Sequence, residues 1–203
     1  MNVLVILAHP DPASFNHALS SAAADAARRN GHAVVLHDLH AERFDPILPS
    51  AEIAKGAPLA PWLRRHCDEL AAADGIVIVH PNWWGQPPAV LKGWIDRVVR
   101  PGVAYAFGEG DGGEGVPIGL LRARTAIVLN TSNTPPARER EAFGDPLEAI
   151  WTRCVFDLCG VKDVRRRTYG IVATSSPDAR SRWLADAADL VASAFPPGPS
   201  GRA

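Results

Sequence analysis

The fold of this chain is decided by the stretch Val3-Leu-Val-Ile-Leu-Ala8, His9, Pro10-Asp-Pro-Ala-Ser14-Phe15-Asn16. Its first six residues indicate a buried strand by their length and branching, and the two prolines prevent the strand from continuing. Ser14 and Asn16 are both suitable N-caps for an Ala-rich helix over 15–29. The free amides and the dipole at the start of that helix favour an anion such as a phosphate. On this segment alone, a βα connection without a ligand stays open.

Strand-like runs alternate with helical stretches along the rest of the chain. Strands are predicted over 3–8, 33–37, 75–80, 125–130 and 164–171, and helices over 15–29, 59–73, 88–99, 146–159 and 177–195. Apolar strands separated by helices indicate an α/β fold with a doubly wound five-stranded parallel sheet. Five strands favour the flavodoxin-like order 2-1-3-4-5, in which a ligand binds at the carboxyl ends of strands 1 and 3. We expect a single domain over 1–195 and a disordered tail over 196–203.

Composition narrows the class of partner. A net charge of −1 and a pI near 6.6 remove the electrostatic argument for nucleic acid or for an anionic membrane, so the expected partner is a small molecule. Cys67, Cys154 and Cys159 form neither an even disulfide set nor a C-x-x-C pair, and we expect core thiols in a reducing compartment. The sequence shows no signal segment and no long apolar span. These features predict a cytoplasmic protein without membrane insertion.

The loop after the third strand is His80-Pro-Asn-Trp-Trp-Gly-Gln-Pro-Pro88. Two adjacent tryptophans cannot both turn inward by strand or helix periodicity, so we expect one of them to face a flat ligand or a partner chain. The alternative is that both rings cover the core of the domain itself. Pro81 and Asn82 would turn the backbone so that its amides point at the same ligand, whereas His80 is assigned to the edge of the core.

The turn after the fourth strand is Asn130-Thr-Ser-Asn-Thr134-Pro-Pro136. Its hydroxyls and amides can satisfy the carbonyls and nitrogens of a ring system, and the alternative is ordinary Asx and Ser/Thr turn chemistry. A helix start that favours an anion thus follows strand 1, an aromatic surface follows strand 3, and a polar turn follows strand 4. A phosphate, a planar ring and a polar ring edge together describe a flavin nucleotide.

Other segments carry weaker signals. The connection over 38–58 has no assigned role, and the acidic loop over 108–115 lacks the spacing of a calcium site, so no metal is predicted. Arg165-Arg-Arg167 has two interpretations, a site for the 2′-phosphate of NADPH or an exposed basic strand end, and the second is favoured. The tryptophans in helical patterns are assigned to the core: Trp62, Trp94, Trp151 and Trp183.

Taken together, these motifs resemble the flavodoxin-like NAD(P)H:quinone oxidoreductases, a group that includes modulator of drug activity B proteins and ancillary flavoproteins of potassium-efflux systems. The resemblance covers nearly the whole chain. It rests on Leu7-Ala-His-Pro10 with Ser14-Phe-Asn16, on His80-Pro-Asn-Trp-Trp84, and on Pro88-Ala-Val-Leu-Lys-Gly-Trp-Ile-Asp-Arg97 leading to Ala104-Tyr-Ala-Phe107.

The resemblance implies a flavin site with three walls. The phosphate and ribityl chain would be held by His9, Ser14, Phe15 and Asn16. The isoalloxazine would be lined by Pro81, Asn82, Trp83 and Trp84. The position of the family's Thr-Thr-Gly-Gly turn, which faces the ring edge, is occupied by Thr131, Ser132, Asn133 and Thr134.

The resemblance also implies the reaction. NAD(P)H would deliver a hydride to N5 of FMN, or alternatively of FAD, and a quinone or similar flat acceptor would then receive two electrons. A homodimer is implied, in which Tyr105 and Phe107 reach the pocket of the partner chain.

Two departures from the family pattern bear on that chemistry. Asn133 and Thr134 replace the two glycines, so we expect strain or an altered ring pose at this turn. The family's Tyr and His beyond the turn are absent, which leaves the catalytic residues unknown, with Tyr105, Arg138 and Arg140 as weak candidates. One alternative function is therefore a flavin-binding regulator or electron carrier with little turnover. Another is a flavodoxin fold that no longer binds flavin.

Overall fold

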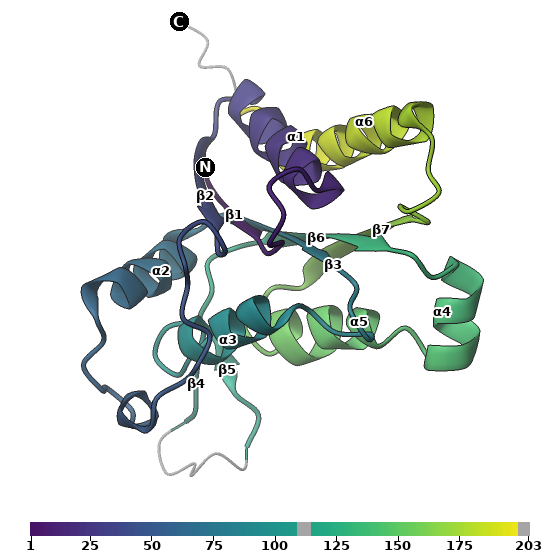
Figure 1. Ribbon diagram of the computed structural model, residues 1–203. Helices are drawn as coiled ribbons and strands as arrows, with labels where there is room; N and C mark the ends of the chain where they lie inside the picture. Colours follow the sequence, from purple (N-terminus) through teal and green to yellow (C-terminus); the bar gives the residue numbers. More distant parts are fainter. Residues whose placement is uncertain (109–114, 199–203) are drawn as a thin grey trace, which may run out of the picture.

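Five parallel strands form the central sheet in the order β2-β1-β3-β6-β7 (Figure 1). They are β1 (Asn2–Leu7), β2 (Ala33–Asp38), β3 (Gly75–Pro81), β6 (Thr125–Ser132) and β7 (Asp163–Gly170). Counting only these strands, the order is 2-1-3-4-5, which confirms the predicted flavodoxin-like topology. The computed structural model describes residues 1–108 and 115–198. Most of the predicted acidic loop over 108–115 (residues 109–114) and residues 199–203 of the predicted tail over 196–203 lie outside the described residues.

Helices cover both faces of this sheet (Figure 1). One face carries α1 (Phe15–Arg29) and α6 (Pro177–Ala194). The other carries α2 (Pro61–Ala72), α3 (Ala89–Val98) and a helical segment made of α5 (Pro146–Ala149) and the π-helix η2 (Ile150–Asp157). Successive β1 side chains enter the two cores alternately, as in Val3 and Leu4. This double burial explains why the first strand is apolar without interruption.

The strand register places the three predicted ligand loops side by side. Leu7 at the end of β1 pairs with Val79 of β3, and Pro81 of β3 pairs with Thr131 of β6. Because the strands are parallel, their carboxyl ends meet at one edge of the sheet. The three loops that start at His9, Pro81 and Thr131 therefore begin next to one another at this edge of the sheet.

Several short elements were not predicted. A helix α4 (Pro136–Phe143) follows the polar turn and ends at Gly144, which has a left-handed conformation. An antiparallel pair is formed by β4 (Tyr105–Ala106) and β5 (Ile118–Gly119), and a 3₁₀ turn η1 (Ser50–Glu52) lies in the 38–58 connection. The helix predicted over 146–159 is real as a helical segment, but most of it is π-helical. Elements this short carry too little periodicity to be recognised from sequence.

Two core assignments are wrong. Cys154 is exposed, although Cys67 and Cys159 are buried thiols as expected. Trp62 is 38% exposed because it covers the 38–58 connection instead of the sheet, with its ring 5.4 Å from that of Phe44. The other helical tryptophans are buried (Trp94, Trp151) or half-buried (Trp183).

The 38–58 connection packs against α3. Arg97 of α3 is buried and makes a two-pronged ion pair with Glu52, with nitrogen–oxygen distances of 2.6 and 3.0 Å. A Cβ atom at Gly93 would collide with the backbone of Pro46, so the absence of a side chain lets the connection lie directly on the helix. This packing gives a structural role to a segment that sequence reasoning left unassigned.

Candidate functional site

A cavity of about 380 Å³ opens at the carboxyl edge of the sheet, where β1, β3 and β6 end. Its lining includes every residue predicted to bind the cofactor except Trp84. The lining residues are His9, Ala13, Ser14, Phe15, Asn16, Pro81, Asn82, Trp83, Thr131, Ser132, Asn133, Thr134, Val172 and Arg180. Three loops that are far apart in the sequence thus surround one space, as the strand register requires.

The first wall of the cavity is built around the N-cap of α1. The Ser14 side chain accepts a hydrogen bond from the backbone N–H of His17, which fixes the start of the helix beside the cavity. The first amides of a helix have no intrahelical partners, so this wall presents donors and the positive end of the α1 dipole. Such an arrangement suits a phosphate group.

A chain of side chains orients the Ser14 hydroxyl. His17 Nε2 lies 2.9 Å from a carboxylate oxygen of Asp38, and its Nδ1 lies 3.0 Å from Ser14 Oγ. Asp38 can only accept, so in the neutral ring the proton is on Nε2 and Nδ1 accepts from the serine hydroxyl. Asp38 at the end of β2 therefore controls, through His17, the direction of a hydroxyl in the cavity wall.

His9 stands at the opening between the first and second walls. Its Nδ1 accepts from the backbone N–H of Asp11 at 3.1 Å, so in the neutral ring the proton lies on Nε2. Partial burial lowers the pKa of His9 below its ordinary value, and the nearby His17 ring acts in the same direction. The His9 ring lies 5.9 Å from that of Trp83, which joins the two walls.

Asn16 bridges the first and third walls. Its side-chain nitrogen donates to the hydroxyl of Thr131 at 2.9 Å. Its Oδ1 atom is buried and has no hydrogen-bond partner within residues 1–108 and 115–198. A buried acceptor without a donor is costly, and a hydroxyl group of a bound ligand would satisfy it. The cavity is therefore chemically suited to a polyhydroxylated chain next to a phosphate.

The second wall ends in a tight hairpin turn. Trp83 and Gln86 exchange two backbone hydrogen bonds of 3.1 and 3.0 Å, and the residues between them, Trp84 and Gly85, both have positive φ. This is the geometry of a type I′ turn, which places Trp84 at the tip. The Trp84 side chain is fully exposed and borders a neighbouring cavity with Phe143, whereas Trp83 faces the cavity of the three walls. Trp83 therefore lines the cavity, whereas Trp84 does not.

A buried network supports the start of the second wall. His80 is fully buried, as expected for the core edge, and its Nδ1 donates to the carbonyl of Pro81 at 2.8 Å. Its Nε2 receives the indole N–H of Trp151 at 2.9 Å and the side-chain amide of Asn130 at 2.8 Å. Burial lowers the pKa of His80 to about 4, so the ring is neutral at pH 7. Its tautomer is fixed by these partners.

The third wall is the turn over 131–134, in which Asn133 and Thr134 stand in place of the two glycines of the family pattern. Neither Asn133 nor Thr134 has a positive φ, so the strain expected from replacing two glycines is not present. The backbone N–H of Thr134 donates to Ser132 Oγ at 3.0 Å, and Asn133 Oδ1 accepts from the N–H of Ala173 at 2.8 Å. The turn is therefore held by its own side chains, which is the Ser/Thr and Asx chemistry that the sequence left open.

Sequence reasoning missed Arg180 in the first turn of α6. Its guanidinium contacts Ser175 Oγ at 2.8 Å and the carbonyl of Val172 at 3.1 Å, and it lies 6.0 Å from the Phe15 ring centre. Arg180 supplies a positive charge to the cavity lining. A clue was its place soon after the fifth strand, whose carboxyl end borders the same sheet edge.

The weak catalytic candidates do not line the cavity. Tyr105 lies in the β4–β5 pair, where burial raises its pKa, and Arg138 of α4 lies 5.8 Å from the centre of the exposed Phe143 ring. Arg140 is also on α4 and is likewise absent from the lining.

The basic strand end predicted at 165–167 is paired with carboxylates. Arg165 contacts Asp163, Arg166 contacts Asp145 and Glu148, and Arg167 contacts Asp186. The prediction of an exposed basic strand end is therefore wrong for Arg166, whose side chain is only 10% exposed. These pairs leave no uncommitted cation on this strand end for a 2′-phosphate.

Comparison with known proteins agrees with the observed fold. The family model described as a flavodoxin-like fold matches residues 1–191. An uncharacterized NAD(P)H oxidoreductase of Haemophilus influenzae is 30% identical over 188 residues, covering 91% of each chain. NAD(P)H dehydrogenase [quinone] 1 of Cavia porcellus is 33% identical over 205 residues, covering 90% of this chain and 73% of that protein.

Solved structures give the same result. An NAD(P)H:quinone oxidoreductase from Methanothermobacter marburgensis superposes with a TM-score of 0.78 at 25% identity, covering 94% of this chain and 95% of that one. An FMN-dependent NADH-azoreductase of Bacillus anthracis in complex with FMN has a TM-score of 0.75 at 15% identity, over 95% and 98% of the two chains, and shares the fold. Among the helices that the structure describes, none has the length and apolar character needed to cross a membrane.

Proposed function

We propose that this chain, which belongs to the NAD(P)H:quinone oxidoreductase family of flavodoxin-like fold, binds FMN in the three-walled cavity and transfers electrons from NAD(P)H to a quinone or similar flat acceptor. When bound, FMN would supply the redox chemistry by accepting a hydride at N5 and passing two electrons on. The protein would contribute binding, orientation and electrostatics. FAD is the alternative cofactor.

The observation that carries this proposal is the match between the three walls and the three parts of a flavin nucleotide. The α1 N-terminus with Ser14 would hold the phosphate, and the unpaired Oδ1 of Asn16 would accept from a ribityl hydroxyl. Trp83 offers an aromatic surface for the isoalloxazine, and the 131–134 turn would face the ring edge. His9 and Arg180 add donors and positive charge around the phosphate and the reduced ring.

A homodimer is part of this proposal because large apolar side chains are exposed, some beside the cavity and others in the β4–β5 region. Trp84 is fully exposed, Phe143 is 54% exposed, and in the β4–β5 region Val116 and Ile118 are 90% and 57% exposed. Large exposed apolar groups near a binding site are typical of interaction surfaces. A second copy that covered Trp84 would complete the pocket over the isoalloxazine. The cytoplasmic location expected from the sequence stays a prediction.

The alternative of a flavin-binding electron carrier or regulator has one observation in its favour. Tyr105, Arg138 and Arg140 do not line the cavity, and the titratable side chains in its lining are His9 and Arg180. A site with so few groups near the ring could hold flavin tightly and turn over slowly.

One experiment separates these functions. The purified chain is incubated with FMN or FAD, free flavin is removed, and oxidation of NADH and NADPH is followed with and without a quinone. Retained colour with quinone-dependent consumption of either nicotinamide supports the oxidoreductase. Retained colour with negligible consumption supports the carrier, and a colourless protein contradicts flavin binding.

A further inference from the structure

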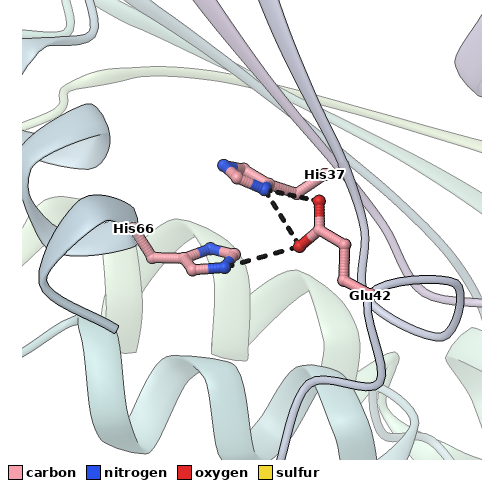
Figure 2. A group of neighbouring side chains, drawn as sticks. All are labelled: His37, Glu42 and His66. Carbon is pink, nitrogen blue, oxygen red and sulfur yellow. Dashed lines mark hydrogen bonds and ion pairs between the residues drawn. The ribbon is translucent and has the colours of Figure 1, made fainter. Parts of the chain in front are cut away.

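A second polar cluster lies on the opposite side of the sheet from the α1 N-terminus. Figure 2 shows His37 from β2, Glu42 from the 38–58 connection and His66 from α2 pointing toward one another. One nitrogen or oxygen atom from each side chain lies within 4.8 Å of the others. His37 and His66 are 3–4% exposed, whereas Glu42 is 31% exposed and faces the opening.

We propose that His37, Glu42 and His66 bind a divalent transition-metal ion, with Zn²⁺ as the favoured ion, through His37 Nδ1, the Glu42 carboxylate and His66 Nε2. Two imidazoles and one carboxylate form a ligand set that Zn²⁺ accepts while keeping a fourth position free. This site is separate from the proposed flavin cavity, with which it shares no lining residue, and the proposal does not depend on flavin binding.

The distances from Glu42 to the two histidines are close to those between ligands in a metal site. His37 Nδ1 lies 2.8 and 3.1 Å from the two oxygens of Glu42, and His66 Nε2 lies 3.4 Å from Glu42 Oε2. Ligand atoms about 2.0–2.1 Å from a tetrahedral Zn²⁺ are about 3.3 Å apart. Only small side-chain shifts are therefore needed to place an ion between these atoms.

Groups around the ligands favour a cation at this position. His37 Nε2 donates to Glu69 at 2.6 Å, which is the carboxylate–histidine arrangement that orients metal-binding imidazoles. Glu42 and Glu69 together would balance the charge of a divalent ion.

A fourth ligand has room to enter. Glu42 and His66 line a cavity of about 410 Å³ together with Arg43, Phe44, Asp45, Trp62 and Arg65. Water from this cavity can complete the coordination sphere. Because the three protein ligands come from a strand, a connection and a helix, a bound ion would tie the connection to the sheet edge and to α2.

Arg43 and Arg65 in the cavity lining disfavour a cation, and Trp94 opposes metal binding in a way that can be tested directly. The indole N–H of Trp94 donates to His66 Nδ1 at 3.3 Å, so the proton of the neutral His66 ring is on Nε2. A metal on Nε2 would move that proton to Nδ1, where it would face the indole N–H. Trp94→Phe removes this conflict without touching a ligand, and we expect it to tighten Zn²⁺ binding severalfold.

Calorimetric titration of the full-length, chelator-treated protein with Zn²⁺ tests the site. We expect one ion per chain. Loss of an outer partner alone typically weakens metal sites by about 10–100-fold, so we expect about that from Glu69→Ala and more than about 100-fold from the shape-conserving Glu42→Gln. His32→Gln changes a buried histidine outside the cluster and is expected to leave the affinity unchanged.

Three results would overturn the proposal. They are no saturable Zn²⁺ binding, an affinity that Glu42→Gln leaves unchanged, and an affinity that falls equally in the His32→Gln control. An unchanged or weaker affinity in Trp94→Phe would contradict His66 Nε2 as a ligand. Circular dichroism of each variant shows whether it is folded before titration.

Discussion

Two neighbouring residues at the end of β2, His37 and Asp38, point to opposite faces of the sheet and take part in different polar clusters. Asp38 faces α1 and controls the Ser14 hydroxyl through His17. His37 faces α2 and lies between Glu42 and Glu69. Alternation of side chains along a strand lets one strand end serve two sites that share no residue. In the first site Asn16 Oδ1 has no hydrogen-bond partner among the described residues, whereas in the second each histidine has a carboxylate partner.

The largest expected effect is a loss of stability in acid, through two histidines that are buried on the α2 face of the sheet. Burial lowers the pKa of His66 and of His80 to about 4 from 6.5. Their neutral forms therefore stabilise the fold above pH 6.5, and this contribution is lost as the pH falls from 6.5 toward 4. We expect the free energy of unfolding to drop by about 3 kcal/mol per residue across this range. Urea denaturation at a series of pH values measures the drop.

His66→Gln provides the control for the α2 face. A glutamine does not titrate, so the variant is expected to lose about half of the acid-dependent destabilisation while His80 keeps the rest. An unchanged pH profile in His66→Gln would contradict a neutral buried His66.

The next largest effect concerns the α1 face. Ser14→Glu places a carboxylate where the phosphate of FMN is proposed to lie, and we expect FMN affinity to fall about 100-fold through charge repulsion. Riboflavin lacks the phosphate, so its affinity should change little. Fluorescence titration with both ligands measures the contrast. Equal weakening of both ligands would show that Ser14 does not lie at the phosphate.

On the α2 face, Glu42→Ala is expected to destabilise without affecting flavin. The substitution leaves the two imidazole donors of the cluster without their shared acceptor, and we expect it to cost about 2 kcal/mol of unfolding free energy in metal-free protein. Urea denaturation and FMN titration are the two measurements. A large loss of FMN affinity would contradict the independence of the two faces.

The smallest expected effect is a gain in FMN affinity. In Asp38→Asn the amide can donate to His17 Nε2, which moves the ring proton to Nδ1 and frees the Ser14 hydroxyl to donate to a phosphate. We expect FMN to bind about three- to tenfold more tightly, with riboflavin unchanged. Weaker FMN binding would contradict the proposed orientation of the hydroxyl chain.

The fold was predictable because its decisive segments carry strong periodic or terminating signals. The apolar run from Val3 to Ala8 requires a strand buried on both faces, and Ser14 is the N-cap of a helix with the predicted bounds, Phe15–Arg29. Because the strand order follows from the alternation of strands and helices, the convergence of three distant loops on one cavity was also predictable.

The features that could not be predicted from the sequence depend on three-dimensional geometry, which the periodicity of apolar residues does not encode. Trp84 and Trp83 are chemically identical neighbours, and only the type I′ turn determines that one faces the cavity and the other the solvent. Arg180 reaches the cavity from the first turn of a helix with ordinary composition. His37 and His66 are 29 positions apart, and only the packing of α2 on the sheet brings them together.

Anaerobic stopped-flow absorbance tests whether the three-walled cavity holds a flavin that accepts electrons from NAD(P)H. Protein loaded with FMN is mixed with NADH or NADPH, and a quinone is added afterwards. We expect the flavin absorbance to bleach with at least one nicotinamide and to return on addition of the quinone. Retained FMN that neither nicotinamide bleaches would contradict the oxidoreductase, and failure to retain any flavin would contradict the assignment of the cavity itself.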